Sequence, residues 1–367
     1  MLTFFIILWS VVGLFVLRLI LFRGPLGANV EEPPKGIIDM HCHTAGIGSG
    51  GSGAVISGNL RDSWKYDVYL KSFGSSDEEI YEYGDQILVD KIVDSIQHSE
   101  YVDGVVLLAL DAPRDEKGKI LEDEMEVYVP NEYVAEQVAR YPELYFGASI
   151  HPNRPDALNQ LNWSKDNGAV LVKWLPNIQG MNPSNERYIS YYQKLIDLDL
   201  PLLVHTGNEE SFTRTDDSLG DPKLLKLPLS MGVKVIAAHV ASSGKSDGYE
   251  NIDRLISMMD DYPNLYSDIS SLTQVNKRKN LRKVINEKKL RGRLLYGTDY
   301  PLTNTIIVNP LQYLLNLTMK QLLDLIRTPN SWDRDVKLKS ALGFRACLLY
   351  TSPSPRDLST SRMPSSA

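Results

Sequence analysis

The chain has 367 residues, of which 43% are hydrophobic and 23% charged, and its formal net charge is −7. These values are typical of a globular protein with one large or two medium domains, and they show no basic excess of the kind that nucleic-acid binding requires. The two cysteines, Cys42 and Cys347, are too few and too far apart to form a disulfide framework. We therefore expect a core stabilised by burial of apolar side chains, and no nucleic-acid partner.

The N-terminus is apolar. Residues 2–22, LTFFIILWSVVGLFVLRLILF, are long enough to cross the ~30 Å hydrocarbon core of a membrane as one helix. Arg18 is the one charge in this run, and it lies about one turn from the end, where its head group can reach the interface. A cleaved signal peptide would need a basic segment before Phe4, and there is none.

We predict that residues 1–24 are an uncleaved transmembrane anchor and that residues 25–35 link it to the rest of the chain. A cleaved signal peptide and a buried core helix are the alternatives. Basic residues lie at the C-terminal side of the apolar run, at Arg18, Arg23 and Lys35. By the positive-inside tendency, these few charges place the large domain in the cytoplasm.

Eight short runs rich in Val, Ile and Leu recur between residues 36 and 345 and are separated by stretches of helical period. Near-continuous apolar strands are typical of a parallel sheet that is buried on both faces. Eight strand–helix units predict a (β/α)8 barrel, the TIM-barrel fold, over residues 36–345. The predicted strands are 36–43, 103–111, 144–152, 168–176, 200–207, 232–240, 264–270 and 293–299, and the predicted helices include 131–141, 154–166, 185–198, 249–261 and 277–290.

Five of the six histidines lie in these runs, at or near the strand ends where such barrels have their active sites. His41 and His43 are two residues apart on the first strand, so both side chains project to one face, where neutral imidazoles can share a metal ion. His205 ends the fifth strand and Asp299 ends the eighth, which neighbours the first in a closed barrel. Three histidines and one aspartate suit zinc, with manganese or iron as alternatives. The sixth histidine, His98, lies in a helical stretch and is predicted to be a surface or packing residue.

The segments DMHCHT, GAVLVKWLPNIQGMNP, PLLVHTG, VIAAHV and YGTDYP occur in this order over residues 40–300. They resemble the amidohydrolase superfamily of metal-dependent hydrolases, in the broad branch that also contains decarboxylases. The resemblance implies that the three histidines and the aspartate just named bind one or two divalent ions. It also implies that His239, in VIAAHV, lies beside the metal and handles a proton or the substrate oxyanion.

The resemblance implies a hydrolase that cleaves a C–N or C–O bond of a small molecule, such as an amide, a cyclic amide or a lactone, with a metal-activated water. In that reaction Asp299 would accept the proton of the water, and His239 would help to stabilise the oxygen of the intermediate. A non-oxidative decarboxylase of an aromatic or muconate-type acid on the same site is the alternative. A barrel that binds without catalysing is a third hypothesis.

Three further residues are candidates for the site. Lys173, in LVKWLPN, is a carboxylated lysine that bridges two metal ions, an unmodified active-site lysine, or a member of a structural ion pair. His151, at the end of the third strand, contacts substrate or caps the strand. Arg61 begins the stretch 61–74, which is a lid that contacts substrate or a packed surface helix. The loop GIGSGGSG, residues 46–53, either folds across the mouth of the barrel, since glycine permits close backbone approach, or is a flexible linker.

The C-terminal residues from Thr351 onward are rich in Ser and Pro. This composition cannot build a core. We predict that residues 346–367 are disordered and non-native, so that the barrel is truncated at its C-terminus and Cys347 does not belong to the native chain. Neither the substrate nor the oligomeric state can be read from the sequence.

Overall fold

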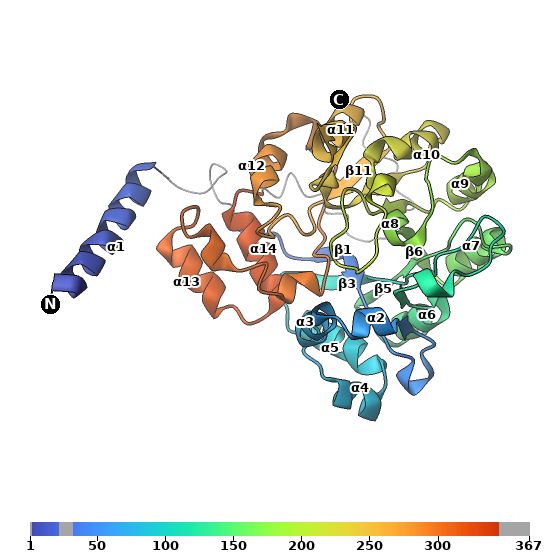
Figure 1. The fold of residues 1–367 in the computed structure, drawn as a ribbon, viewed down its shortest axis with the longest axis horizontal. Helices are drawn as coiled ribbons and strands as arrows, with labels where there is room; N and C mark the ends of the chain where they lie inside the picture. The colour runs from blue at the N-terminus through green and yellow to red at the C-terminus, as the bar shows by residue number, and fades with distance from the viewer. Residues whose placement is uncertain (1, 22–31, 345–367) are drawn as a thin grey trace.

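The structure, a computed structural model, describes residues 2–21 and 32–344. The predicted tail at 346–367 and most of the predicted linker lie outside the described residues. Figure 1 shows a barrel surrounded by helices, with the N-terminal helix α1 (Leu2–Leu21) apart from it.

Eight parallel strands form one sheet in the order β1-β3-β5-β6-β7-β8-β11-β12. Each strand falls within or beside one of the eight predicted runs. Backbone hydrogen bonds from Met40 N to Tyr296 O (3.0 Å) and from Asp299 N to His41 O (2.8 Å) join the two ends of the sheet. The predicted (β/α)8 barrel is confirmed. The strands are β1 (Ile37–His43), β3 (Val102–Leu108), β5 (Leu144–Ala148), β6 (Ala169–Trp174), β7 (Leu202–Val204), β8 (Val235–Ala237), β11 (Leu265–Asp268) and β12 (Leu294–Leu295).

Helices cover the outer face of the barrel (Figure 1), and the five predicted helices correspond to α6, α7, α9, α11 and α12. Short ribbons β2 (Val55–Ile56) with β4 (Val127–Tyr128) and β9 (Lys245–Ser246) with β10 (Tyr249–Glu250) lie outside the barrel sheet. The helices are α2 (Gly58–Arg61), α3 (Trp64–Ser72), α4 (Asp77–Tyr83), α5 (Gln86–Gln97), α6 (Asn131–Arg140), α7 (Ala157–Asp166), α8 (Pro176–Gln179), α9 (Ile189–Asp197), α10 (Lys226–Met231), α11 (Asn251–Met258), α12 (Arg278–Asn286), α13 (Met319–Arg327) and α14 (Ser331–Ala341).

The apolar core has two parts, one on each face of the sheet. The larger part lies between the sheet and the helices. Val105 and Leu107 of β3 belong to it, whereas the alternate residues Val106 and Leu108 belong to a smaller cluster together with Leu203 and Ile236. This alternation is the period of two that a strand imposes, so the smaller cluster fills the inside of the barrel.

Strand β1 contains a β-bulge between Asp39 and Cys42, and His41, the first of the two predicted metal ligands, lies in it. Its pairing with β3 advances from Asp39 to Cys42 while β3 advances only from Val105 to Leu107. The extra residue lets Met40 join the inner apolar cluster while the next residue, His41, also reaches the candidate site. The bulge therefore sets the direction in which the first of the two histidines points.

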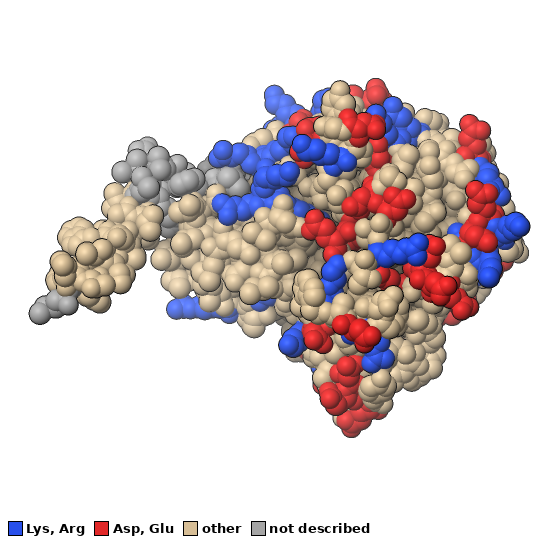
Figure 2. Space-filling model, in the orientation of Figure 1, with Lys and Arg blue, Asp and Glu red and all other residues tan. Residues whose placement is uncertain are grey.

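Helix α1 is the segment that the sequence predicts to be an anchor. Its side chains from residue 2 to residue 16 are exposed, with Phe4 and Trp9 each 68% exposed, and none of these residues is charged (Figure 2). Within residues 2–21 and 32–344, the structure shows no helix with both the length and the apolar character needed to span a membrane. The predicted anchor is thus not supported.

Candidate metal centre

His41, His43 and Asp299 meet at the C-terminal end of the barrel. His41 Nε2 lies 3.1 Å from His43 Nε2 and 3.4 Å from Asp299 Oδ1, and His43 Nε2 lies 3.3 Å from the same oxygen. The histidines end β1, and the aspartate follows β12, which lies next to β1 in the ring. Three of the four predicted metal ligands are therefore brought together by barrel closure.

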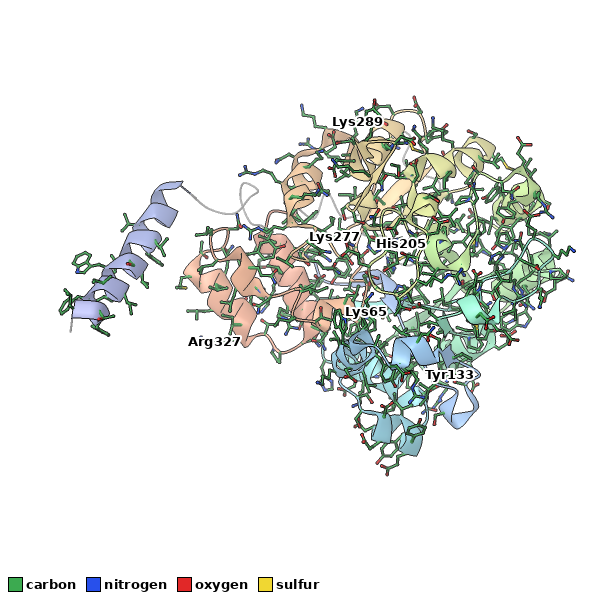
Figure 3. All side chains as sticks on the ribbon, viewed as in Figure 1. Lys65, Tyr133, His205, Lys277, Lys289 and Arg327 are labelled. Atoms are coloured by element: carbon green, nitrogen blue, oxygen red, sulfur yellow. The ribbon has the colours of Figure 1, made fainter. Side chains whose placement is uncertain are left out.

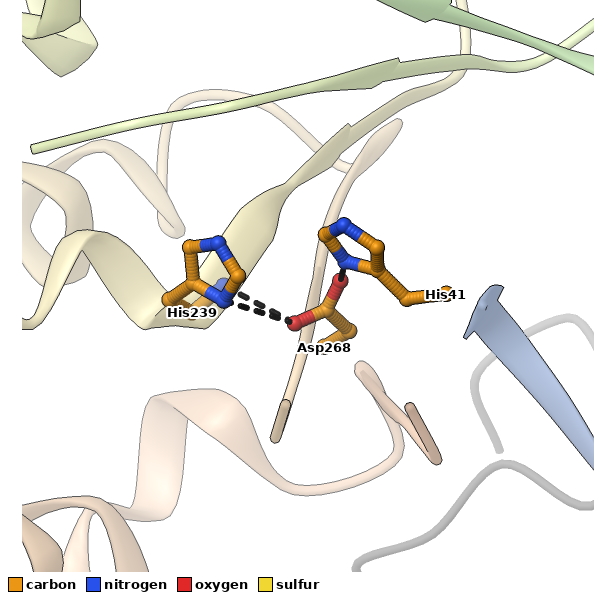
Figure 4. A group of neighbouring side chains, drawn as sticks. All are labelled: His41, His239 and Asp268. Atoms are coloured by element: carbon orange, nitrogen blue, oxygen red, sulfur yellow. Dashed lines mark hydrogen bonds and ion pairs between the residues drawn. The ribbon is translucent and has the colours of Figure 1, made fainter. Parts of the chain in front are cut away.

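Asp268, the last residue of β11, orients the ring of His41 (Figure 4). Asp268 Oδ2 lies 2.9 Å from His41 Nδ1, and Asp268 Oδ1 accepts the backbone N–H of His239 at 2.8 Å. Because an ionised carboxylate only accepts, His41 donates its Nδ1–H and presents the lone pair of Nε2 to the cluster. Burial, with the charge of Lys173 adding to it, lowers the pKa of His41 to about 4, so the ring is neutral.

Burial alone would raise the pKa of Asp268. The adjoining His41, whose Nδ1–H is hydrogen-bonded to this carboxylate, outweighs burial and holds the pKa of Asp268 below its usual range. Asp268 is therefore ionised, as an acceptor of the His41 proton must be. Asp268 was not among the residues predicted for the site, although an acidic side chain at the end of a predicted barrel strand, in NLYSDIS, is a signal for it.

His239 presents an unprotonated Nε2 to the site. Its Nδ1 lies 2.7 Å from Ser270 Oγ, and Ser270 gives its own hydrogen to Asp268 Oδ1, so the histidine is the donor in the first contact. Its Nε2 lies 3.9 Å from Asp299 Oδ2. Burial holds the pKa of His239 well below its usual value, so the ring is neutral at neutral pH.

The backbone at both candidate catalytic residues is in the left-handed region, with φ of 62° at Asp299 and 60° at His239. Such a conformation costs a non-glycine residue roughly 1–3 kcal/mol and persists only where the surroundings fix it. Here it is fixed by the hydrogen bonds from Asp299 N to His41 O and from His239 N to Asp268 Oδ1, each 2.8 Å. The strain is thus held by the same residues that build the site.

His205, after β7, lies in the same pocket but outside the cluster of three donors. Its Nδ1 lies 3.3 Å from Glu209 Oε2, so Nδ1 carries the proton. Its Nε2 is buried and has no hydrogen-bond partner among the described residues. An unpartnered buried acceptor is costly, and a metal ion would satisfy it.

Lys173, on β6, is fully buried beneath the cluster. Its Nζ lies 2.9 Å from His41 Nε2, and burial lowers its pKa to about 8. The contact is with an imidazole and not with a carboxylate, so a structural ion pair does not account for this lysine. The carbamate and the unmodified active-site lysine remain the two hypotheses.

This set of donors fits a divalent cation. The donor atoms of His41, His43 and Asp299 lie within 4.8 Å of one another. Those of His41, His239 and Asp268 also lie within this distance, but there the Nδ1–H of His41 is hydrogen-bonded to Asp268, so the first group is the one that leaves donor atoms for a cation. Imidazole nitrogens and carboxylate oxygens are ligands of zinc, manganese and iron, so the residues themselves do not choose between these metals.

The donors form the floor of a pocket whose rim includes the glycine-rich loop. Gly46 and Ile47 line the pocket, and the N–H groups of Ile47 and Gly48 each donate to Asp85 at 2.9 Å. A Cβ at Gly46 would lie 2.2 Å from Asp85 Oδ2, so no larger residue fits there without displacing that carboxylate. The loop therefore shapes the pocket, as the first of its two interpretations proposed.

None of the three residues predicted to contact substrate, Arg61, His151 and Lys173, lines the pocket, and neither does His239. Arg61 points towards Tyr81, whose hydroxyl lies 3.1 Å from Nη2. His151 is buried with both ring nitrogens engaged, because Nε2 contacts Gln179 O at 3.1 Å and Nδ1 accepts a backbone N–H at 3.1 Å. His151 thus has the contacts of the strand cap that the sequence offered as its alternative role.

The fold and these donors define a (β/α)8 barrel with a candidate metal site at the C-terminal ends of its strands. The sequence model of the amidohydrolase family matches residues 38–325, so the chain belongs to the amidohydrolase family, which is metal-dependent.

Two solved structures share the fold. An uncharacterized TIM-barrel protein from Bordetella bronchiseptica has 16% identity and a TM-score of 0.52, over 83% of this chain and 99% of that one. A probable 2-pyrone-4,6-dicarboxylic acid hydrolase from Acinetobacter baumannii, with citric acid bound, has 15% identity and a TM-score of 0.50, over 89% of this chain and 100% of that one. At these identities the likeness concerns the fold alone. No curated protein matches the chain.

Proposed function

We propose that the protein is a metal-dependent hydrolase that cleaves a C–N or C–O bond of a small molecule, such as an amide, a cyclic amide or a lactone. The observation that carries this proposal is the convergence of His41, His43 and Asp299 on the floor of a pocket. These three residues would hold the metal, with His205 as a fourth ligand and Lys173 as a further candidate. We propose zinc, with manganese or iron as alternatives.

A divalent ion bound here would act as a Lewis acid and lower the pKa of a coordinated water towards ~7. Asp299 is placed to take the proton of that water. Its Oδ1 faces the two imidazoles of β1, and its Oδ2 accepts a hydrogen bond from Ser271 Oγ at 2.5 Å. Burial would raise the pKa of Asp299, but His239 and His41 outweigh it and hold that pKa well below its usual range, so the carboxylate is ionised and can act as a base.

His239 is placed to pass the proton on. Its unprotonated Nε2 and Asp299 Oδ2 are 3.9 Å apart, and both are acceptors, so a proton on the carboxylate would have a basic nitrogen close by. The imidazole can then take the proton from the carboxylate and deliver it to the leaving oxygen or nitrogen. These two residues are the ones that we assign to catalysis.

The decarboxylase alternative uses the same floor of the pocket. Its substrate is an acid, and a carboxylate is bound most strongly by Arg or Lys. No Lys or Arg is among the described residues that line the pocket. An acid would therefore depend on the metal ion alone to bind its carboxylate, whereas hydrolysis of an uncharged bond needs no cation in the walls.

The amount of metal in the purified protein tests the proposal. We expect elemental analysis to give at least one divalent ion per chain, because the paired histidines need a cation between them. Two ions, with the added mass of a carbamate on Lys173, would identify a binuclear hydrolase. A folded sample that retains no metal after incubation with zinc or manganese would contradict the proposed function.

We also propose, from the apolar run at 2–22 and the exposed side chains of α1, that residues 1–24 attach the protein to a membrane with the barrel on the cytoplasmic side. Large exposed apolar surfaces mark interaction sites. Removal of residues 1–30 is expected to shift the protein from the membrane fraction to the supernatant without changing its metal content. Fractionation of cells that express either form measures this. A truncated protein that still sediments with membranes would place the attachment elsewhere.

A further inference from the structure

The pocket above the candidate metal centre has mostly apolar walls. They are contributed by the loop after β1, by α2 and α3, by the loop after β7, and by the 3₁₀ turn that begins at Leu302 after β12. Tyr66 and Tyr69 are the two aromatic hydroxyl side chains in the lining. The apolar side chains of the walls include Ile47, Leu60, Phe73, Phe212 and Leu302.

The charged groups of the lining are acidic. Apart from the histidines, the ionisable side chains that face the pocket near the floor are Glu209 and Asp299, and the lining residues that the structure describes include no Lys or Arg. Lys173 lies below the floor, against His41. Lys277 and His205 are labelled in Figure 3. Burial lowers the pKa of His205, and the charges of Lys173 and then Lys277 add to this, but Lys277 is not part of the lining.

The wall segments carry four cations, and none of them lines the pocket. Arg61, at the end of α2, contacts the hydroxyl of Tyr81. Lys65, on α3, donates to the backbone oxygens of Glu210 and Phe212 at 2.8 Å and 2.5 Å. Lys71, also on α3, is exposed, and Arg214, in the loop after β7, pairs with Glu124 at 3.1 Å.

The wall is also fixed in place before any ligand binds. The contacts of Lys65 and a hydrogen bond from Tyr69 OH to Ser211 O (2.9 Å) join α3 to the loop after β7. The same loop is held from the other side by Glu126, which accepts the N–H of Thr213 at 2.8 Å. A preformed apolar wall costs little ordering on binding, so it selects ligands by shape and polarity.

We propose that the substrate is an uncharged ester, lactone or amide whose acyl part is an alkyl chain or an aryl ring, bound between α2, α3 and Phe212. This inference rests on the proposed function and adds the substrate class to it. An alkyl chain gains about 4-fold in kcat/KM for each methylene that it buries, which is ~0.8 kcal/mol per CH₂. A carboxylate at the far end of the chain would meet Glu209 and apolar walls with no cation, and burying an unpaired charge is costly.

Matched pairs of substrates test this on the full-length protein loaded with zinc. The p-nitrophenyl esters of acetate, butyrate and hexanoate are compared with the p-nitrophenyl monoester of adipate, which has the chain length of hexanoate but ends in a carboxylate. We expect kcat/KM to rise about 16-fold from butyrate to hexanoate, for two methylenes, and to be at least about 100-fold lower for the adipate monoester than for hexanoate. Equal or faster cleavage of the adipate monoester would overturn the inference while leaving the hydrolase assignment intact.

Binding separates this inference from the proposed function. Calorimetric titration of the same protein with hexanamide and with the monoamide of adipic acid needs no turnover. Tighter binding of hexanamide, with no ester cleaved, would refute the hydrolase and retain the apolar substrate class. Equal affinity for the two amides would refute the substrate class.

A charge placed in the wall provides a matched variant. Leu302→Arg adds a cation to the pocket lining. It is expected to reduce the ratio of kcat/KM for the hexanoate ester to kcat/KM for the adipate monoester by at least about 10-fold. Leu311→Arg makes the same change at a side chain that is 56% exposed and does not line the pocket, and it is expected to leave this ratio unchanged. An unchanged ratio in a folded Leu302→Arg protein would count against this wall as the binding site. If that variant does not fold, the ester kinetics and the amide titrations of the wild-type protein test the substrate class.

Discussion

Asp299→Ala is expected to lower kcat by at least about 10²–10⁴-fold and to release metal from the protein. The size of the loss follows from removing a general base, and the release follows from removing a ligand whose Oδ1 lies 3.3–3.4 Å from both imidazoles of β1. His205→Ala should also weaken metal retention, because its unpartnered Nε2 is the other predicted ligand atom. Turnover under saturating substrate and metal per chain after dialysis measure both effects.

Asp299→Asn separates the two roles of the side chain. The amide keeps an oxygen that can ligate a metal, but it cannot accept a proton at neutral pH. We therefore expect this variant to retain more metal than Asp299→Ala while losing turnover to a similar extent. Asp94→Asn, at a side chain that is 75% exposed, is the matched control and should resemble the wild type in both measurements. Full activity with full metal content in Asp299→Ala would refute the site assignment.

The barrel could be predicted because each strand corresponds to a short apolar run in the sequence, and eight such runs alternate with helical segments. The strand ends were less predictable. The run 200–207 contains only three strand residues, Leu202–Val204. The residues after Val204 are His205, Thr206 and Gly207, which carry no apolar signal, so hydropathy does not mark the point where the backbone leaves the ladder. His98 is 74% exposed, in agreement with its prediction as a surface residue.

The site could be predicted only in part, because its contacts join residues that are distant in sequence. His41 and Asp268 are 227 positions apart, and no local pattern connects them. The bulge in β1 is likewise a property of its pairing with β3, although the two histidines could be placed on one face from their spacing. Arg61 could not be placed because the direction of its side chain is set by Tyr81, which belongs to a later helix.

Among residues that do not line the pocket, Asp268 is the one whose substitution, Asp268→Asn, is expected to lower metal affinity and turnover most. Asp268 Oδ1 accepts two backbone N–H groups, those of His239 at 2.8 Å and Ser270 at 3.1 Å. The carbonyl oxygen of an asparagine must therefore occupy this position, since its NH₂ group would face two donors. The NH₂ group then faces His41 Nδ1, which must become an acceptor and move its proton to Nε2.

A His41 ring with its proton on Nε2 cannot offer that atom to a metal. We expect Asp268→Asn to weaken metal affinity by about 10–100-fold and to lower turnover at limiting metal, which a competition titration against a chelator and kinetics at several metal concentrations would measure. Asp335→Asn is the control: this buried carboxylate contacts Lys339 at 2.7 Å and Tyr296 at 2.9 Å, so its loss tests destabilisation without a change at His41. Unchanged metal affinity in a folded Asp268→Asn protein would show that the tautomer of His41 is not set by this aspartate. Equal losses of affinity in both variants would attribute the effect to the stability of the barrel and not to the orientation of one ring.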